Sequence, residues 1–306
     1  MDRRCFLKYQ LHGALWLAAG GAGLFGPSLG LAQGTPDIAV AKGQPGPATR
    51  AAVGLLGGMS AFVKPGQRVV IKPNMSFAGG PEMANNTHPD VIKELAAMCW
   101  EAQAADVLVL DNPLQGPEDC LERSGIRTAC LGLGKKMVYS VQDDALFSEA
   151  EIPDATSMRH NRFMKDVLKA DVLIAAPVAK SHGATGVSLS LKGMMGLIKD
   201  REDMHYKYEL DQAIVDLNRR LKAKLAVIDA TRVLTSNGPY GPGEVDKKNM
   251  IIASTDPVAA DAMTVRSCTW YGRAIKPNQV KHLRLAHEQG LGRIDVENMR
   301  VGEVSV

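Results

Sequence analysis

The chain has 306 residues, of which 45% are hydrophobic and 23% charged, with 36 Lys and Arg against 33 Asp and Glu. This composition is that of a packed globular protein, and it excludes a disordered chain, a collagen-like fibre and a short disulfide scaffold. A formal net charge of +3 does not indicate a nucleic-acid partner. With 5% aromatic residues, the chain also lacks the stacking platforms of single-strand binders.

Residues 1–32 form a predicted export signal. Arg3 and Arg4 precede a weakly apolar run rich in Gly and Ala, and the stretch closes on small residues at Ala32. This arrangement resembles a twin-arginine signal peptide. We therefore expect transport by the twin-arginine export machinery, cleavage after Ala32, a periplasmic location and no stable membrane anchor after cleavage. The alternative is an uncleaved anchor, although the apolar run is short for a spanning helix.

The cysteines that remain after the predicted cleavage are Cys99, Cys120, Cys130 and Cys268. No two of them have Cys-x-x-Cys spacing, so an iron–sulfur cluster or a structural zinc site is not expected. An oxidising compartment permits disulfides, but the sequence assigns no pairing. Buried free thiols are the alternative, above all for Cys99, which lies on a predicted apolar helix.

Four apolar runs have the pattern of strands that are buried on both faces. In chain order they cover residues 68–72, 105–111, 170–176 and 224–229. Continuous apolar runs of this kind are typical of strands in a parallel sheet.

Helical patterns follow these strands. Thr87 can cap a helix over 88–103, an apolar stripe predicts a helix over 209–222, and Asp256 followed by Pro257 predicts the start of another. The alternation predicts an α/β fold, with a mostly parallel central sheet and helices on both faces. No linker-like break is visible, so residues 33–306 are predicted to form a single α/β domain.

Polar residues follow each predicted strand where its apolar run ends. In chain order they are Lys72, Asn74, Asp111, Lys180, His182 and Asp229. Ligands of open parallel sheets bind beyond the carboxyl ends of the strands. We therefore expect these side chains to converge on one cleft. Taken singly, each has a simpler role, since a strand-ending Asp often only caps the next helix.

Seven short motifs accompany these positions. They are VVIKPN (69–74), NTHP (86–89), VLVLDN (107–112), KSH (180–182), LSLKGMMGL (189–197), NGP (237–239) and DPVAAD (256–261). This ordered set resembles the domain of unknown function family 362, over a core of about 65–270. Many members of that family also carry a ferredoxin-like module with cysteine clusters, which this sequence lacks. The resemblance implies a fold and site positions, but no reaction.

Three lysines in these motifs could carry chemistry. Lys72 and Lys180 come after strand-like runs, whereas Lys192 is placed at the cleft only by its motif. A buried ammonium costs several kcal/mol unless it is paired. One interpretation is a pocket for a carboxylate or phosphate, in which one lysine acts as base or nucleophile. The other is a set of internal salt bridges to Asp111, Asp229 and Asp261.

A divalent metal is a second hypothesis. Asp111, Asp229 and His182, with Asn74 beside them, offer oxygen and nitrogen ligands. A lone His is more often a hydrogen-bonding residue than a ligand. The other histidines, His282 among them, lack ligand spacing and are expected at the surface.

A cofactor-binding set is also predicted. Gly183, Gly186 and Ser188 lie on a small-residue loop whose backbone N–H groups could approach an anion at a helix start, with Asn74 nearby.

The function expected from these features is that of an exported enzyme with a cleft lined by Lys and Asp. It would act on a small anionic substrate, with a divalent metal as its candidate cofactor. The alternatives are a non-catalytic periplasmic protein that binds a metal, cofactor or anion, and an accessory partner of an exported redox complex.

Overall fold

The computed structural model describes residues 34–134 and 137–306. Of these, residues Thr35–Val306 form one compact unit. The predicted twin-arginine signal, residues 1–32, lies outside the described residues.

A parallel sheet forms the centre of this unit, as the apolar runs predicted. Its strands lie in the order β10-β7-β2-β3-β4, and every neighbouring pair among them is parallel. Their bounds are β2 Arg68–Pro73, β3 Asp106–Asp111, β4 Val138–Ser140, β7 Val172–Ala176 and β10 Leu225–Leu234. The carboxyl ends of these strands therefore lie at one edge of the sheet.

The sheet continues beyond β10 in a mixed arrangement that the sequence did not predict. Strand β12 (Met250–Ser254) is antiparallel to both β10 and β1 (Ile38–Lys42). The edge strand β13 (Val301–Ser305) is parallel to β1. The sheet is thus mostly parallel, with an antiparallel strand between its two parallel regions.

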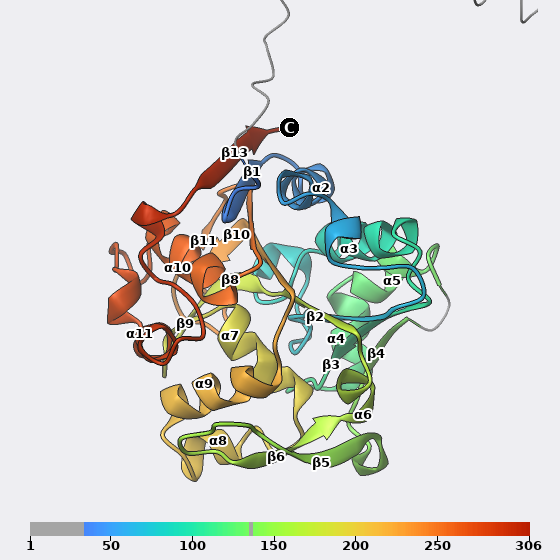
Figure 1. Ribbon diagram of the computed structural model, residues 1–306, viewed down its shortest axis with the longest axis vertical. Coiled ribbons are helices and arrows are strands. Elements are labelled where there is room, and N and C mark those ends of the chain that lie inside the picture. The colour runs from blue at the N-terminus through green and yellow to red at the C-terminus, as the bar shows by residue number, and fades with distance from the viewer. Residues whose placement is uncertain (1–33, 135–136) are drawn as a thin grey trace, which may run out of the picture. The chain divides into compact units, whose positions relative to one another are not determined.

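Helices cover both faces of the sheet, as predicted (Figure 1). Alternate residues along β2 separate two cores, because Val69 and Ile71 pack in one and Val70 in the other. The first core contains α2 Pro45–Leu55, α3 Pro89–Glu101, α4 Pro117–Arg123 and α5 Ile126–Cys130. The second contains α7 Ser190–Gly193, α8 Asp203–Tyr206, α9 Leu210–Arg220, α10 Pro257–Ser267 and α11 Lys281–Glu288.

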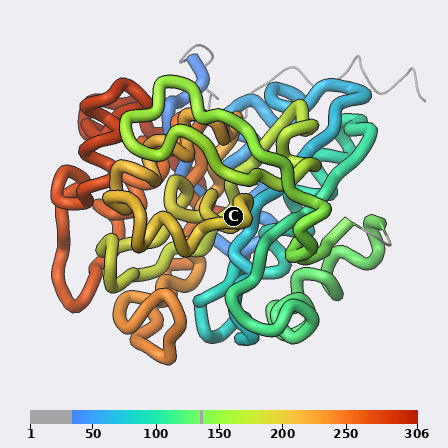
Figure 2. Tube along the Cα trace, turned by 90° about the horizontal axis from the view of Figure 1, so that it is seen from below, coloured from blue at the N-terminus to red at the C-terminus, as the bar shows by residue number. Residues whose placement is uncertain are grey.

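Smaller elements complete the unit. A separate two-strand sheet, β5–β6, lies at the end opposite to β1 and β13 in Figure 1 and crosses the near side of Figure 2 in light green. The remaining helices and strands are β5 Phe147–Glu151, β6 His160–Met164, α6 Lys165–Leu168, β8 Val178–His182, β9 Gly186–Ser188 and β11 Val245–Asp246. Short 3₁₀ turns cover Met59–Ala61, Pro81–Met83, Asp144–Leu146, Met194–Leu197, Pro277–Gln279 and Val296–Asn298.

Two of the three predicted helix starts are confirmed and one is wrong. Asp256 caps α10 by accepting hydrogen bonds from Val258 and Ala259 N–H, at 2.9 and 3.1 Å. The 209–222 helix is found as α9. The cap of α3, however, is His88, whose Nδ1 accepts the Asp90 N–H. Thr87 instead bonds with its hydroxyl to the Asn74 N–H and the Ala176 carbonyl, so it joins β2 to β7.

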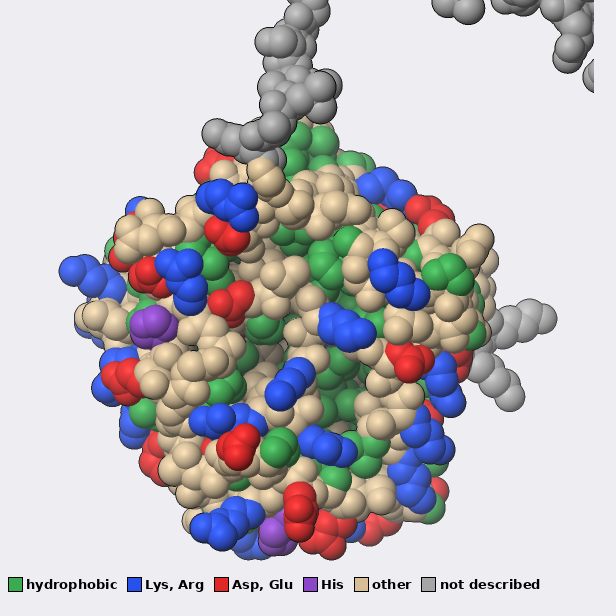
Figure 3. All heavy atoms as spheres, viewed as in Figure 1, with side chains coloured by type: hydrophobic (Ala, Val, Ile, Leu, Met, Phe, Trp, Pro, Cys, Tyr) green, Lys and Arg blue, Asp and Glu red, His purple; other side chains and the backbone are tan. Residues whose placement is uncertain are grey.

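Among the described residues, no helix is long and apolar enough to cross a membrane. The four cysteines of this unit, Cys99, Cys120, Cys130 and Cys268, are buried free thiols. Burial raises the pKa of the Cys99 thiol to about 12, so this thiol stays protonated at neutral pH. Figure 3 shows acidic and basic side chains interspersed on the face of Figure 1, in keeping with the small net charge.

Candidate functional site

A cavity of about 560 Å³ lies at the carboxyl ends of β2 and β3, against the hairpin of β8 and β9. Eight of the predicted site residues line it: Lys72, Asn74, Asp111, Lys180, His182, Gly183, Ser188 and Lys192. Parallel strands bring the first three together, and the chain beyond β7 brings the two later lysines. In Figure 2 the orange loop that carries Tyr240 lies beside the cyan loop after β2, and the Asn85 amide donates to the Tyr240 carbonyl between them.

Lys72 and Asp111 form a buried ion pair in the wall. Lys72 Nζ lies 3.1 Å from Asp111 Oδ1, and the two side chains are 3% and 0% exposed. The carboxylate also accepts hydrogen bonds from the Met75 and Asn112 N–H groups and from the Ser76 hydroxyl. Burial lowers the pKa of Lys72, and the Asp111 charge opposes that shift. Lys72 thus has the internal salt bridge of the second interpretation.

Gly196 packs directly against this ion pair. A Cβ on Gly196 would lie 2.6 Å from Lys72 Cε and would also collide with the Asp111 carboxylate. The Gly196 carbonyl accepts the Asn112 N–H at 3.0 Å, which fixes the backbone there. The close approach therefore needs a residue without a side chain.

Lys180 is equally buried but has no carboxylate partner among the described residues. Its Nζ donates to the Asn85 carbonyl at 2.6 Å and lies 4.7 Å from the centre of the Phe77 ring. Burial lowers the pKa of Lys180 to about 7, and the charges of Lys72 and Lys192 add to that effect while Asp111 opposes it. A large share of Lys180 is therefore a neutral amine near neutral pH.

Lys192 is the second cavity lysine without an ion pair in the described part of the chain. Its Nζ has one hydrogen-bond contact, to the Met195 sulfur at 3.6 Å. Burial lowers the pKa of Lys192 to about 8, and the nearby Arg201 charge lowers it further. Arg201 also lines the cavity and donates to the carbonyls of Asn112 and Pro113, at 2.5 and 2.9 Å. Lys180 and Lys192 thus both face the cavity without a carboxylate partner in the described structure.

Asp261 fixes the turn that carries Lys192, instead of pairing with a lysine. It is fully buried, and its two oxygens accept the N–H groups of Ser190 and Leu191 at 2.8 and 3.0 Å. Burial raises its pKa to about 7. On the far side of the turn, the Asn218 amide donates to the Leu191 carbonyl at 2.9 Å. The motifs DPVAAD and LSLKGMMGL therefore meet in space.

The predicted cofactor residues are divided between two cavities. Asn74, Gly183 and Ser188 line the cavity of the lysines, whereas Gly186 lines an adjacent cavity of about 650 Å³. The Asn74 Oδ1 accepts the Val178 N–H at 3.1 Å, which joins β2 to β8. The predicted helix start gives no support for anion binding, because α7 has four residues and Asp261 already accepts its first N–H groups.

The three predicted metal ligands do not come together. Asp229 is not in the cavity wall: it pairs with Arg232 at 2.7 Å and accepts N–H groups from His88 and Thr231. Leu225 and Val227 pack in the core that contains α3, and the Asp229 carboxylate is turned to the start of that helix, where it accepts the His88 N–H.

His182 lines the cavity, but burial lowers its pKa to about 3, and its Nδ1 accepts the Ala184 N–H. Within residues 34–134 and 137–306, no group of three or more His, Cys, Asp or Glu side chains is arranged to hold a metal ion. The donor set around the cavity therefore does not fit a divalent cation.

His282, expected at the surface, is fully buried, so that prediction was wrong. Its Nδ1 lies 3.2 Å from Asp211 Oδ1, and its Nε2 has no partner in the described structure. Burial lowers its pKa, while Asp211 opposes the shift. The apolar positions after His282 in α11 carried this information, because Leu283 and Ala286 are buried on the same helix.

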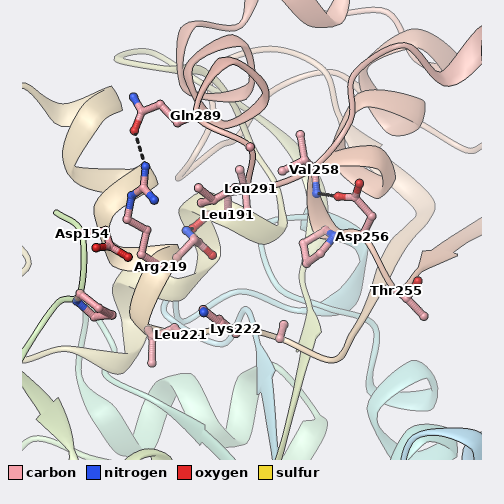
Figure 4. A pocket seen from close by; sticks show the side chains of 15 residues that line it. Asp154, Leu191, Arg219, Leu221, Lys222, Thr255, Asp256, Val258, Gln289 and Leu291 are labelled. Carbon is pink, nitrogen blue, oxygen red and sulfur yellow. Dashed lines mark hydrogen bonds between the residues drawn. The ribbon is translucent and has the colours of Figure 1, made fainter. Parts of the chain in front are cut away.

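Another cavity, of about 540 Å³, contains none of the predicted site residues (Figure 4). In it Arg219 points to Gln289, with a hydrogen bond of 2.9 Å, and the Asp256 carboxylate points to the Val258 N–H. Arg219 and Asp256 thus each have a hydrogen-bond partner in the wall of this cavity.

Sequence reasoning missed the parts of the cavity that come from loops. Arg201, Phe77 and Tyr240 line it, yet none of them follows a strand-like run. Phe77 and Tyr240 pack with ring centres 4.9 Å apart beside Lys180. The NGP motif, which directly precedes Tyr240, was the available signal for one of these loops.

The sequence matches the family model described as "Domain of unknown function (DUF362)" over residues 69–266. The chain belongs to the DUF362 family. The matched range contains the strand ends, the hairpin and the α7 turn that build the cavity.

One curated protein and two solved structures are similar to parts of this chain. A thylakoid-associated protein of Synechocystis sp. is 26% identical over 214 residues, which are 67% of this chain and 64% of that protein. The lactate racemase apoprotein of Thermoanaerobacterium thermosaccharolyticum has a TM-score of 0.43 at 11% identity, covering 71% of this chain and 54% of that one. A Thermotoga maritima protein has a TM-score of 0.37 at 11% identity, covering 81% and 60%. The chain thus spans between about half and two thirds of the length of these relatives.

Proposed function

We propose that this protein is an exported enzyme that binds a small anionic substrate in the cavity of Lys180 and Lys192. The observation that carries the proposal is the burial of these two side chains, 2% and 8% exposed, in one cavity wall without a carboxylate partner in the described structure. An unpaired buried ammonium costs several kcal/mol. A substrate carboxylate or phosphate would supply the missing negative charge.

Several features suit a small organic anion over a bare inorganic one. Phe77 and Tyr240 offer ring surfaces beside Lys180, while Arg201 stands next to Lys192. The cavity of about 560 Å³ lies within the range of small-molecule sites. The proposal includes no metal ion, because the described residues offer no suitable group of ligands.

The competing function is a non-catalytic binding protein for the same anion. What favours an enzyme is Lys180, whose pKa of about 7 keeps an amine available as base or nucleophile at neutral pH. Turnover separates the two functions, since a binding protein would be stabilised by its anion and leave it unchanged.

Anion binding is tested by thermal unfolding of the mature protein with a panel of small carboxylates and phosphates. At about 100 times its Kd, a true ligand adds roughly 2.7 kcal/mol to the free energy of unfolding. Lys192→Met should lose this stabilisation, whereas Lys248→Met should keep it, because Lys248 pairs with Asp246 at 2.8 Å outside the cavity. Equal stabilisation of both variants would contradict the proposed site.

Export is a separate part of the proposal and rests on Arg3 and Arg4. Replacing both with Lys should leave the precursor in the cytoplasm, because the twin-arginine route reads this pair. Fractionation of cells that express the two forms is the measurement. Undiminished accumulation of the double variant in the periplasm would contradict twin-arginine export, without bearing on the cavity.

A further inference from the structure

The cavity holds two chemically different kinds of cation. Lys72 has the Asp111 carboxylate at 3.1 Å, which favours its charged form. Within the described structure, the Lys180 Nζ contacts a carbonyl oxygen and a ring face but no carboxylate, and the charges of Lys72 and Lys192 disfavour its ammonium form. The same cavity therefore combines an ion-paired lysine with an amine that gives up its proton easily.

An amine of this kind contributes little to simple anion binding. Near neutral pH the neutral fraction of Lys180 provides no charge to attract an anion, whereas Lys192 and Arg201 do. What a neutral amine provides is a nitrogen lone pair. Desolvated lysines beside other cations are the usual nucleophiles for carbonyl groups.

The contacts of Lys180 leave that lone pair free to react. The Asn85 carbonyl, at 2.6 Å, accepts one N–H and so fixes the direction of the amine. The Phe77 ring lies 4.7 Å from Nζ and is backed by Tyr240, so apolar surface covers another side. Since Lys180 lines the cavity, the remaining approach to its nitrogen is from the cavity itself.

We propose that the substrate is a small carboxylic acid that also carries an aldehyde or ketone group, and that Lys180 attacks this carbonyl to form an imine. This inference rests on the proposed function and adds the substrate class to it. Lys192 and Arg201 bind the carboxylate, which holds the carbonyl carbon against the amine.

The reaction balances without an oxidant or reductant. The Lys180 nitrogen bonds to the carbonyl carbon, and the carbonyl electron pair moves to its oxygen. The Lys192 ammonium protonates that oxygen and regains a proton from the nitrogen, which gives a carbinolamine. Loss of water from the carbinolamine, with the second nitrogen proton, leaves a carbon–nitrogen double bond.

The experiment traps this imine. The purified mature protein is incubated near neutral pH with glyoxylate or pyruvate and sodium cyanoborohydride, and then analysed by intact mass and peptide mapping. We expect one reduced adduct per chain, on Lys180. Lys180→Met should lose it, and Lys192→Met should need at least about tenfold more probe for half-maximal labelling, because it lacks one charge-assisted contact. Thermal unfolding of each variant shows whether it is folded.

An internal control lysine and a separate measurement of binding make the outcomes decisive. Lys248, ion-paired outside the cavity, reports the background reactivity of an ordinary lysine. Labelling of Lys180 no faster than that of Lys248 would overturn the imine. If the probes or their hydroxy-acid analogues still stabilise the protein through Lys192, the proposed function stands and only the carbonyl chemistry fails. If neither adduct nor stabilisation by any small anion is found, both fail.

Discussion

Two clusters of buried charge lie near the carboxyl edge of the same sheet, and they differ in whether the chain supplies every partner. At the start of α3, Asp229 pairs with Arg232 and accepts further hydrogen bonds from Thr231 and the His88 N–H. In the cavity, Lys180 and Lys192 have no carboxylate partner among the described residues, although Lys72 does. The first cluster is complete as folded, while the second gains most from a negative charge brought from outside.

The two clusters contribute differently to the stability of the fold. Asp229 joins β10 to the start of α3 by accepting the His88 N–H. Its partner Arg232 extends this connection, because it also donates to the carbonyl of Pro81, in the turn that precedes α3. Lys180 is held in place by one carbonyl oxygen and gives the structure no ion pair in return. Removal of the two side chains should therefore have opposite consequences.

The largest expected effect is on stability, at Asp229. Asp229→Ala leaves the Arg232 guanidinium buried without its partner, and we expect a loss of about 3–5 kcal/mol in the free energy of unfolding. Lys180→Met should cost little or even stabilise, because it removes a buried amine that has no carboxylate partner in the described structure. Urea denaturation of both variants is the measurement. A loss at Lys180→Met as large as that at Asp229→Ala would end the distinction between the clusters.

A smaller effect is expected at Gly196, which packs against the ion pair of Lys72 and Asp111. Gly196→Ala would force a methyl group against Lys72 and Asp111, which are held to each other by their ion pair. Overpacking of this kind costs about 1–3 kcal/mol. Denaturation curves should show that loss, and the matched control, Gly54→Ala in α2, should show none because nothing lies within 4 Å of its added Cβ. Indistinguishable curves would mean that the ion pair is not packed as described.

The central strands and the main helices were accessible from the sequence because their signals are local. Runs such as 69–71 and 172–176 are apolar at every position, as strands covered on both faces must be. The direction of β12 was not accessible, since a five-residue apolar run is equally compatible with parallel and antiparallel pairing. Likewise, the NTHP motif could not show that the packing of β2 against β7 engages Thr87, which leaves the cap of α3 to His88.

The site was only partly accessible, for a similar reason. Lys72, Asp111 and Lys180 could be grouped because strand ends share an edge. Asp229 was grouped with them wrongly, since the shared edge does not tell toward which neighbours a strand-end carboxylate turns. Arg201 and Tyr240 come from loops whose positions depend on long-range contacts, and no local pattern encodes those.

A pH dependence should separate the clusters further. The folded protein releases the Lys180 proton near pH 7, whereas a lysine in the unfolded chain, whose ordinary pKa is 10.5, releases it much later. Between these values the unfolded chain binds more protons, so raising the pH favours folding, by about 1.4 kcal/mol per pH unit for one such group. Lys180→Met should flatten the rise measured by denaturation between pH 7 and 10. A saturating anion should also flatten it, because a nearby negative charge raises the pKa of the lysine. A slope unchanged by both would contradict the unpaired state of Lys180.

The smallest effect on stability is expected for a solvent-exposed ion pair, which provides the reference for the buried charges of both clusters. Arg284 and Glu288 lie four residues apart on α11, with 3.5 Å between their charged atoms and side chains 46% and 52% exposed. Exposed pairs of this spacing contribute about 0.3–0.5 kcal/mol, and less in high salt. Two features reduce even that value. The basic residue precedes the acidic one, which is the weaker order, and Glu288 ends the helix, where a negative charge opposes the helix dipole.

Glu288→Gln should therefore change the free energy of unfolding by less than about 0.5 kcal/mol in urea denaturation at low salt. It should also leave anion binding intact, because neither residue lines the cavity. A loss comparable to that of Asp229→Ala would mean that burial is not what distinguishes the charges of this protein.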